Sequence, residues 1–171
     1  MPKLFRRLFA SHDPKGAMQP LYQAIVQEGR QPHWYLEGKV PDTVDGRFDM
    51  IVAILAQVMM RLESLGAAQE SVWLTELFID DMDGQLRQEG IGDVVVGKHI
   101  GRMMSALGGR LSAYRAALSG ETELSEALNR NLYRGASPTG SALAYVESRL
   151  RAYWVRLGSV TRPALIAGKL G

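Results

Sequence analysis

The sequence of 171 residues contains no cysteine. Disulfides, thiol nucleophiles and thiolate metal ligands are therefore excluded, and the redox compartment stays open. Long apolar runs are also missing: no stretch approaches the ~18 uncharged apolar residues of a membrane-spanning helix, so we expect a soluble or peripherally attached protein. The three histidines, His12, His33 and His99, have no neighbour at metal-ligand spacing.

Strand patterns are missing as well, because no stretch alternates apolar and polar residues with a period of two. Hydrophobic residues nevertheless make up 46% of the chain, which excludes a disordered protein and suffices, at this length, for one sizeable core. We predict an all-α fold, a single-domain bundle of about six helices around a central apolar helix. The predicted parts are a basic amphipathic arm over 1–17, a helical domain over 18–160 and a basic tail over 161–171.

The central helix is predicted from the segment 40–65, which has the most apolar helical pattern in the sequence. Its apolar residues recur at spacings of three and four and so share one helix face. They are Phe48, Ile51, Val52, Leu55, Val58, Met59 and Leu62, with Ile54 and Met60 widening the stripe. Asp45 is the predicted N-cap, and Asp49 lies in the first turn, where the helix dipole favours an anion. A long loop over 30–46 precedes this helix, and further helices are expected over 18–28, 69–87, 94–118, 123–133 and 141–157.

Charge is distributed unevenly although the net charge is only +2. The two ends are basic and the segment 63–93 is acidic, which suits docking onto charged partners; the alternative is a set of solvated faces. The N-terminal arm mixes apolar and basic residues, as a membrane-surface or partner-binding anchor does, and the alternative is a segment folded onto the core. Its residues are Leu4, Phe5, Arg6, Arg7, Leu8 and Phe9.

Residues 92–99 nearly match the phosphate-binding pattern G-x-x-x-x-G-K-S/T. The match fails because His99 has no hydroxyl for magnesium and because no strand pattern precedes the segment. The basic tail lacks the interleaved aromatic residues of a base-stacking groove, so no specific nucleic-acid partner is expected. A Ser/His/Asp signature is also missing.

Asp80, Asp81 and Asp83 form an acidic cluster that suggests an enzyme. Clustered carboxylates on a helix bind magnesium and, through it, pyrophosphate, so the alternative function is a magnesium-dependent helical enzyme acting on a polyprenyl pyrophosphate. Such enzymes use two facing acidic motifs, and the sequence has no second cluster. We therefore predict no catalysis, no metal and no cofactor, and interpret the cluster as a solvated face or a docking surface.

An ordered set of motifs runs through most of the chain. The most specific are PDTVDGRFD over 41–49 and GIGD over 90–93. They are accompanied by Leu21, Tyr22, Tyr35, Asp81, Met82, Asp83, Leu86, Arg87, Lys98, Gly109, Arg110, Ala113, Tyr114, Asn129, Arg130, Asn131 and Tyr133. Over roughly residues 18–135 the set resembles the ubiquinol–cytochrome c chaperone family, which consists of assembly factors for the cytochrome bc1 complex.

The resemblance implies a non-catalytic helical chaperone that binds newly made cytochrome b and passes it into the bc1 complex. Its implied partners are cytochrome b as the client, a small partner chaperone, and the ribosome or the inner-membrane surface. Since no long targeting extension is seen, the chain looks like a bacterial member. Its expected location is then the cytoplasm or the periphery of the inner membrane, and the matrix side of the mitochondrion for a eukaryotic member.

Two groups of residues are candidates for partner binding. Trp34 and Tyr35 offer apolar area in the long loop, and the alternative is that they seal the core beneath it. The charged candidates either form a docking patch or serve as caps and turn networks. They are Asp42, Asp45, Arg47, Asp49, Asp81, Asp83, Arg87, Asp93 and Lys98.

Overall fold

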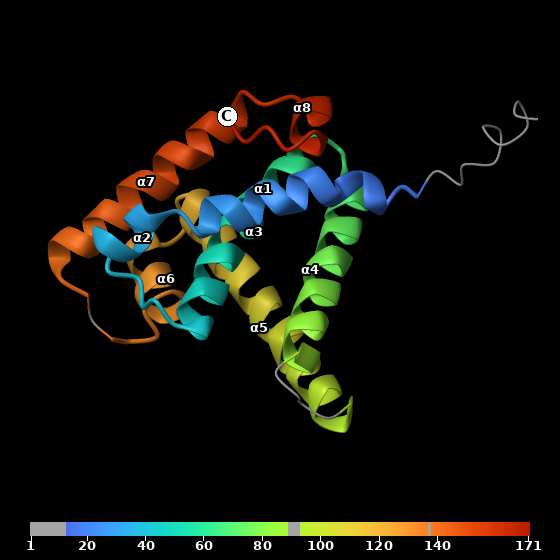
Figure 1. The fold of residues 1–171 in the computed structure, drawn as a ribbon. Helices are drawn as coiled ribbons and strands as arrows, with labels where there is room; N and C mark the ends of the chain where they lie inside the picture. Colours follow the sequence, from blue (N-terminus) through green and yellow to red (C-terminus); the bar gives the residue numbers. More distant parts are fainter. Residues whose placement is uncertain (1–12, 89–92, 137) are drawn as a thin grey trace, which may run out of the picture.

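Every regular element in the described part of the chain is a helix (Figure 1). The computed structural model describes residues 13–88, 93–136 and 138–171, with the backbone alone at 86, 93–96 and 99. The elements are the 3-10 helix η2 (Gly16–Met18), α1 (Gln19–Gly29), α2 (Pro32–Leu36), α3 (Val44–Ser64), α4 (Ala68–Gln88), α5 (Asp93–Leu118), α6 (Leu124–Asn131), α7 (Gly140–Gly158) and α8 (Arg162–Ile166). The predicted all-α bundle is confirmed, and α2 and α8 are additional short helices.

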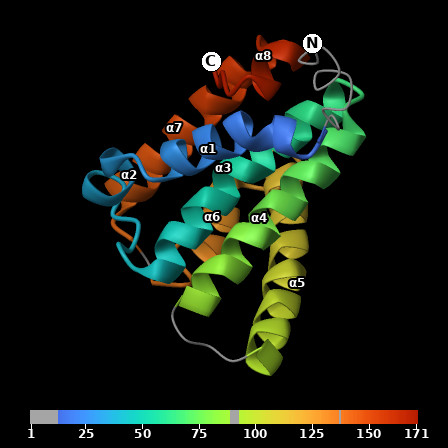
Figure 2. The ribbon, with the colours of Figure 1, turned by 45° about the vertical axis from the view of Figure 1, so that its right-hand side comes forward.

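Helix α3 is the centre of the bundle, as its apolar pattern predicts. It packs against α1, α4, α5 and α7, and Figures 1 and 2 show it enclosed by these helices. Val52, Ile54 and Leu55 are fully buried. Its N-cap is Thr43, whose Oγ1 accepts a hydrogen bond from the Gly46 N–H at 3.1 Å. The prediction of Asp45 as the cap is therefore wrong, because Asp45 lies inside the first turn, where its carboxylate still favours the positive end of the helix dipole.

The segment before α3 is more ordered than the predicted long loop, because it contains α2 and folds back onto the core. Gly46 allows this close approach: a Cβ there would lie 1.9 Å from the Pro41 carbonyl oxygen. Gly29 plays a similar part where α1 crosses α3, since a Cβ there would lie 3.0 Å from the Cα of Ile51. Glycine is needed at both places because backbone atoms occupy the space that a side chain would fill.

Helices α4 and α5 run antiparallel and extend past the beginning of α3 (Figures 1 and 2). Leu77 and Phe78 of α4 are buried, whereas Val72 is 50% exposed. On α5, a Cβ at Gly97 or Gly101 would meet no described atom within 4 Å.

The two ends of the chain differ in what the structure describes. Within 161–171, the predicted basic tail, α8 packs against α1 and buries Leu165, and Arg162 pairs with Glu70 of α4. The predicted N-terminal anchor falls outside the described residues. It comprises Leu4, Phe5, Arg6, Arg7, Leu8 and Phe9.

Candidate functional site

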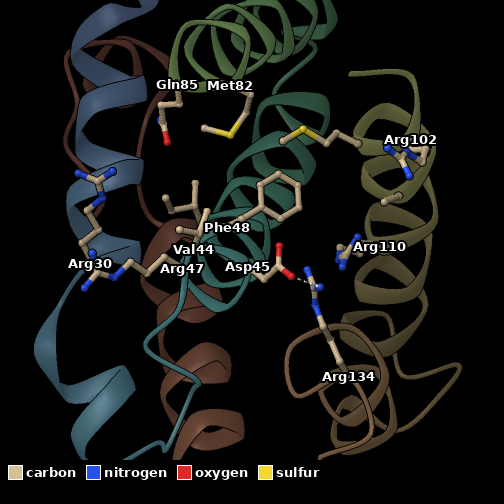
Figure 3. A pocket seen from close by; sticks show the side chains of 13 residues that line it. Arg30, Val44, Asp45, Arg47, Phe48, Met82, Gln85, Arg102, Arg110 and Arg134 are labelled. Carbon is tan, nitrogen blue, oxygen red and sulfur yellow. Dashed lines mark hydrogen bonds and ion pairs between the residues drawn. The ribbon is translucent and has the colours of Figure 1, made fainter. Parts of the chain in front are cut away.

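An open pocket of about 680 Å³ lies where the start of α3 faces α4 and α5 (Figure 3). Its floor is apolar because one stripe of each helix turns toward it, with spacings of three and four residues along α3 and α5. The floor consists of Val44, Phe48 and Ile51 from α3, Met82 from α4, and Met103 and Ala106 from α5. This volume lies in the range of ligand-binding cavities, about 300–1,000 Å³.

Five arginines surround this apolar floor. They come from four parts of the chain: Arg30 from the end of α1, Arg47 from α3, Arg102 and Arg110 from α5, and Arg134 from the segment after α6. Among the described residues that line the pocket, Asp45 alone has a carboxylate. The arginines therefore make the rim cationic over an apolar base (Figure 3).

Asp49 holds two of these arginines, and its own side chain has no exposed surface. Arg134 donates from Nε to Asp49 Oδ2 at 2.5 Å, and Arg110 Nη2 lies 2.7 Å from Asp49 Oδ1 without the alignment of a hydrogen bond. Arg134 also donates from Nη1 to Asp45 Oδ2 at 2.7 Å. Burial raises the pKa of Asp49, and both arginines oppose that shift. This network joins α3, α5 and the segment after α6.

Arg134 is held in an unusual backbone conformation, with φ at 51°. The left-handed region is unfavourable for residues with a side chain, and the following Gly135 also has a positive φ, of 78°. Strained residues of this kind persist where surrounding contacts determine their position. For Arg134 those contacts are the two carboxylates, which direct its guanidinium to the pocket (Figure 3).

Phe48 connects the floor to the rim. Its ring lies 5.6 Å from that of Phe78, centroid to centroid, and the guanidinium carbon of Arg110 lies 5.7 Å from its centroid. Contact with the ring face is favourable for a cation, so Arg110 is held by Phe48 as well as by Asp49.

The comparison with known families agrees with the motifs. The family model described as ubiquinol-cytochrome C chaperone matches residues 36–170. The chain belongs to this family. It is also similar to the crystal structure of the Cbp3 homolog from Brucella abortus, with 29% identity, a TM-score of 0.78, and coverage of 96% of this chain and 92% of that one. A comparison with curated protein sequences finds no match.

In this member of the ubiquinol-cytochrome C chaperone family, each carboxylate of the acidic cluster on α4 contacts a neighbouring side chain. Asp80 pairs with Lys15 at 2.5 Å, the hydroxyl of Tyr22 donates to Asp81 at 2.6 Å, and Arg87 donates to Asp83 at 2.7 Å. The three carboxylates thus face three different partners. In the described ranges no group of three or more histidine or acidic side chains is placed to hold a metal. The alternative of a magnesium-dependent enzyme is not supported.

Of the two aromatic residues in the predicted loop, Trp34 is buried and Tyr35 is partly exposed. Trp34 is 1% exposed and donates from Nε1 to the Glu28 carbonyl at 2.9 Å, while the half-buried Tyr35 donates to the Gly29 carbonyl at 2.7 Å. Trp34 therefore seals α2 against the core and offers no surface to a partner. Trp34 is therefore removed from the candidates for partner binding, because its indole forms its hydrogen bond and its apolar contacts inside the fold.

The structure brings only part of the predicted charged set together. Asp45 and Arg47 line the pocket, Asp49 contacts Arg110 and Arg134 of its rim, and Asp42 pairs with Arg47 at 2.6 Å. Lys98 is exposed on α5, and the side chain of Asp93 lies outside the described residues.

Arg30, Arg102 and Arg134 are pocket residues that the sequence did not predict. One signal was present: Asp49 lies among apolar residues on α3, and a carboxylate in such surroundings requires a cation. That signal does not say which arginine supplies it. Of the helices that the structure describes, none is long and apolar enough to cross a membrane.

Proposed function

We propose that the protein is a non-enzymatic assembly chaperone that binds newly made cytochrome b and assists its incorporation into the bc1 complex. The family supports the chaperone role, and the pocket of α3, α4 and α5 is the observation that supports the binding of a client. A chaperone must present accessible apolar surface with moderate affinity, and the pocket combines such a floor with an open, polar rim.

The floor suits a client whose sequence varies along its length. Met82 and Met103 are flexible and polarizable, so they adapt to different apolar side chains better than branched residues do. The rigid part of the site is Phe48, whose ring contacts both Phe78 and Arg110. A client segment would lie on these side chains until it is released into the complex.

We also propose that the protein acts at an anionic surface in the cell. The basic termini favour an anionic surface, such as the cytoplasmic side of the inner membrane or the ribosome, at which cytochrome b emerges. A small partner chaperone is a further expectation from the family. Tyr35, Lys98 and the pair of Asp83 and Arg87 remain candidates for that second interface, because they lie away from the pocket floor.

The test uses a photoreactive residue at one of two positions that match in exposure. Val44 lies in the pocket and is 72% exposed, while Val155 lies on α7, away from the pocket, and is 74% exposed. We expect crosslinking in cells to capture cytochrome b from position 44 and not from position 155. A strain without the protein should lose assembled bc1 complex while the transcript of cytochrome b persists. Capture from neither position, together with normal assembly in the deletion strain, would contradict the proposal.

A further inference from the structure

The charges around the pocket do not balance one another. Arg47, Arg110 and Arg134 each have a carboxylate partner, in Asp42, Asp49 and Asp45. Arg30 and Arg102 line the same pocket, and neither forms an ion pair with any residue that the structure describes. Both side chains are exposed and hydrated, so their charges are available to a ligand.

These two arginines lie on opposite sides of the apolar floor. Arg30 comes from the end of α1 and Arg102 from α5, and Figure 3 shows them flanking the pocket with Phe48 between them. A ligand that covers the apolar floor and forms ion pairs with both Arg30 and Arg102 therefore needs two separate anionic groups joined by an apolar part. Guanidinium groups hold carboxylates through paired, charge-assisted hydrogen bonds, which makes a carboxylate the suitable group at each side.

We propose that the pocket takes a polypeptide segment in which apolar side chains lie between two carboxylates, one for Arg30 and one for Arg102. This inference rests on the proposed function and states the chemistry of the client segment. Charge complementarity favours a polypeptide over an anionic lipid, because a lipid has a single headgroup at one end of its chain. The cations of this pocket instead stand at two ends of an apolar surface.

The experiment measures the binding of a short fluorescent peptide by anisotropy. The probe has an apolar middle and a glutamate toward each end, and its matched control has glutamines in place of the glutamates. We expect the glutamate peptide to bind more tightly, by about tenfold for each carboxylate. Added salt should weaken the glutamate peptide more than the glutamine peptide.

Two double variants assign the effect to the pocket. Arg30→Gln/Arg102→Gln should lower the affinity for the glutamate peptide to that for the glutamine peptide, and should leave the glutamine peptide unchanged. The control Arg130→Gln/Arg151→Gln removes the same charge from exposed arginines outside the pocket and should leave both affinities unchanged. Circular dichroism checks that both variants fold.

Three results would overturn the inference: equal affinity for the two peptides, an equal loss in both double variants, or a different ligand class. The last is measured with phosphatidylglycerol vesicles. If Arg30→Gln/Arg102→Gln abolishes vesicle binding and leaves peptide binding unchanged, the two arginines serve a lipid.

Crosslinking from Val44 separates this inference from the proposed function. If cytochrome b is captured equally with and without Arg30→Gln/Arg102→Gln, the client role stands and the carboxylate requirement is wrong. If cytochrome b is not captured even with both arginines present, and the deletion strain assembles the bc1 complex normally, the proposed function fails. The peptide preference then decides the ligand chemistry of the pocket independently.

Discussion

Two groups of aspartates in this protein have the same composition and opposite structural roles. One group, Asp42, Asp45 and Asp49, surrounds the start of α3, and the other, Asp80, Asp81 and Asp83, lies on α4. Asp49 has no exposed surface and meets two arginines, whereas Asp80 is 64% exposed and meets a lysine at the surface. Asp42 and Asp45 are 59% and 71% exposed, so the burial of Asp49 alone, and not the number of carboxylates, distinguishes the two groups.

The physical reason is the cost of removing a charge from water. A hydrated ion pair gains little from its partner, because the solvent already stabilises both charges. A buried carboxylate has lost that solvent, so its partners must replace it. The α3 group therefore organises the pocket. The α4 group instead connects α4 to Tyr22 of α1 and to Lys15, which precedes α1.

The largest expected effect is that of Asp49→Ala. It leaves the guanidinium groups of Arg110 and Arg134 without their buried counter-charge, so the free energy of unfolding should fall by about 3–5 kcal/mol. Asp80→Ala should change it far less, because the pair with Lys15 is hydrated. Urea denaturation of both variants measures the difference, and equal losses would remove the distinction between the two groups.

The second largest effect on the free energy of unfolding is expected at Gly46, beside the α3 group, and is compared with that at Gly84, beside the α4 group. Gly46→Ala should lower the free energy of unfolding by up to about 3 kcal/mol, because its methyl group would overlap the Pro41 carbonyl oxygen. Gly84→Ala, in the interior of α4, meets no described atom within 4 Å and should be neutral or stabilising by up to about 1 kcal/mol. Thermal melts of the two variants test this pair, and destabilisation by Gly84→Ala would contradict the open space described there.

The hydroxyl of Tyr22 links α1 to the α4 group. Tyr22→Phe removes its hydrogen bond to Asp81 and should cost about 1 kcal/mol at neutral pH. Burial, together with that bond, raises the pKa of Tyr22 above its ordinary value of 10.0. The folded state therefore keeps a proton that the unfolded state loses, so the stabilisation is complete below pH 10.0 and declines above it. Denaturation at neutral and at alkaline pH should show a smaller alkaline loss in Tyr22→Phe than in the unchanged protein.

The smallest effect concerns the pH dependence of Asp49. Burial raises its pKa above the ordinary value of 3.8, so the folded state binds a proton more readily than the unfolded state. Its contribution to stability therefore declines as the pH rises from 3.8 to the raised value. Relative to Asp49→Asn, which does not titrate, the unchanged protein should lose stability over this range. A gain instead would mean that Arg110 and Arg134 outweigh the loss of solvent.

The sequence predicted the long helices closely because their signal is local. Helix α4 was expected over 69–87 and spans Ala68–Gln88, and α7 was expected over 141–157 and spans Gly140–Gly158. Apolar residues repeat often enough in such segments to establish the period. Helices of five residues, such as α2 and α8, contain too few repeats for this, and packing against the core forms them instead.

The candidate site was predicted less completely because it is assembled from distant segments. Asp45, Arg47 and Asp49 were found through one continuous motif, whereas Arg134 is 85 residues away from the Asp49 that it binds. Nothing in local spacing connects two such residues. Trp34 was wrongly included among the partner-binding residues for a different reason. An aromatic residue in a loop has the same sequence pattern whether it faces the solvent or the core.

By itself the sequence determined the all-α class, the central helix and, through its motifs, the family, since each depends on residues close together along the chain. The tertiary structure alone decided which charges are buried, which are paired and which remain available to a ligand. These properties depend on solvent access and on distances between helices. For this reason Asp49 holds Arg110 and Arg134 inside the fold, while Arg30 and Arg102 face an open pocket.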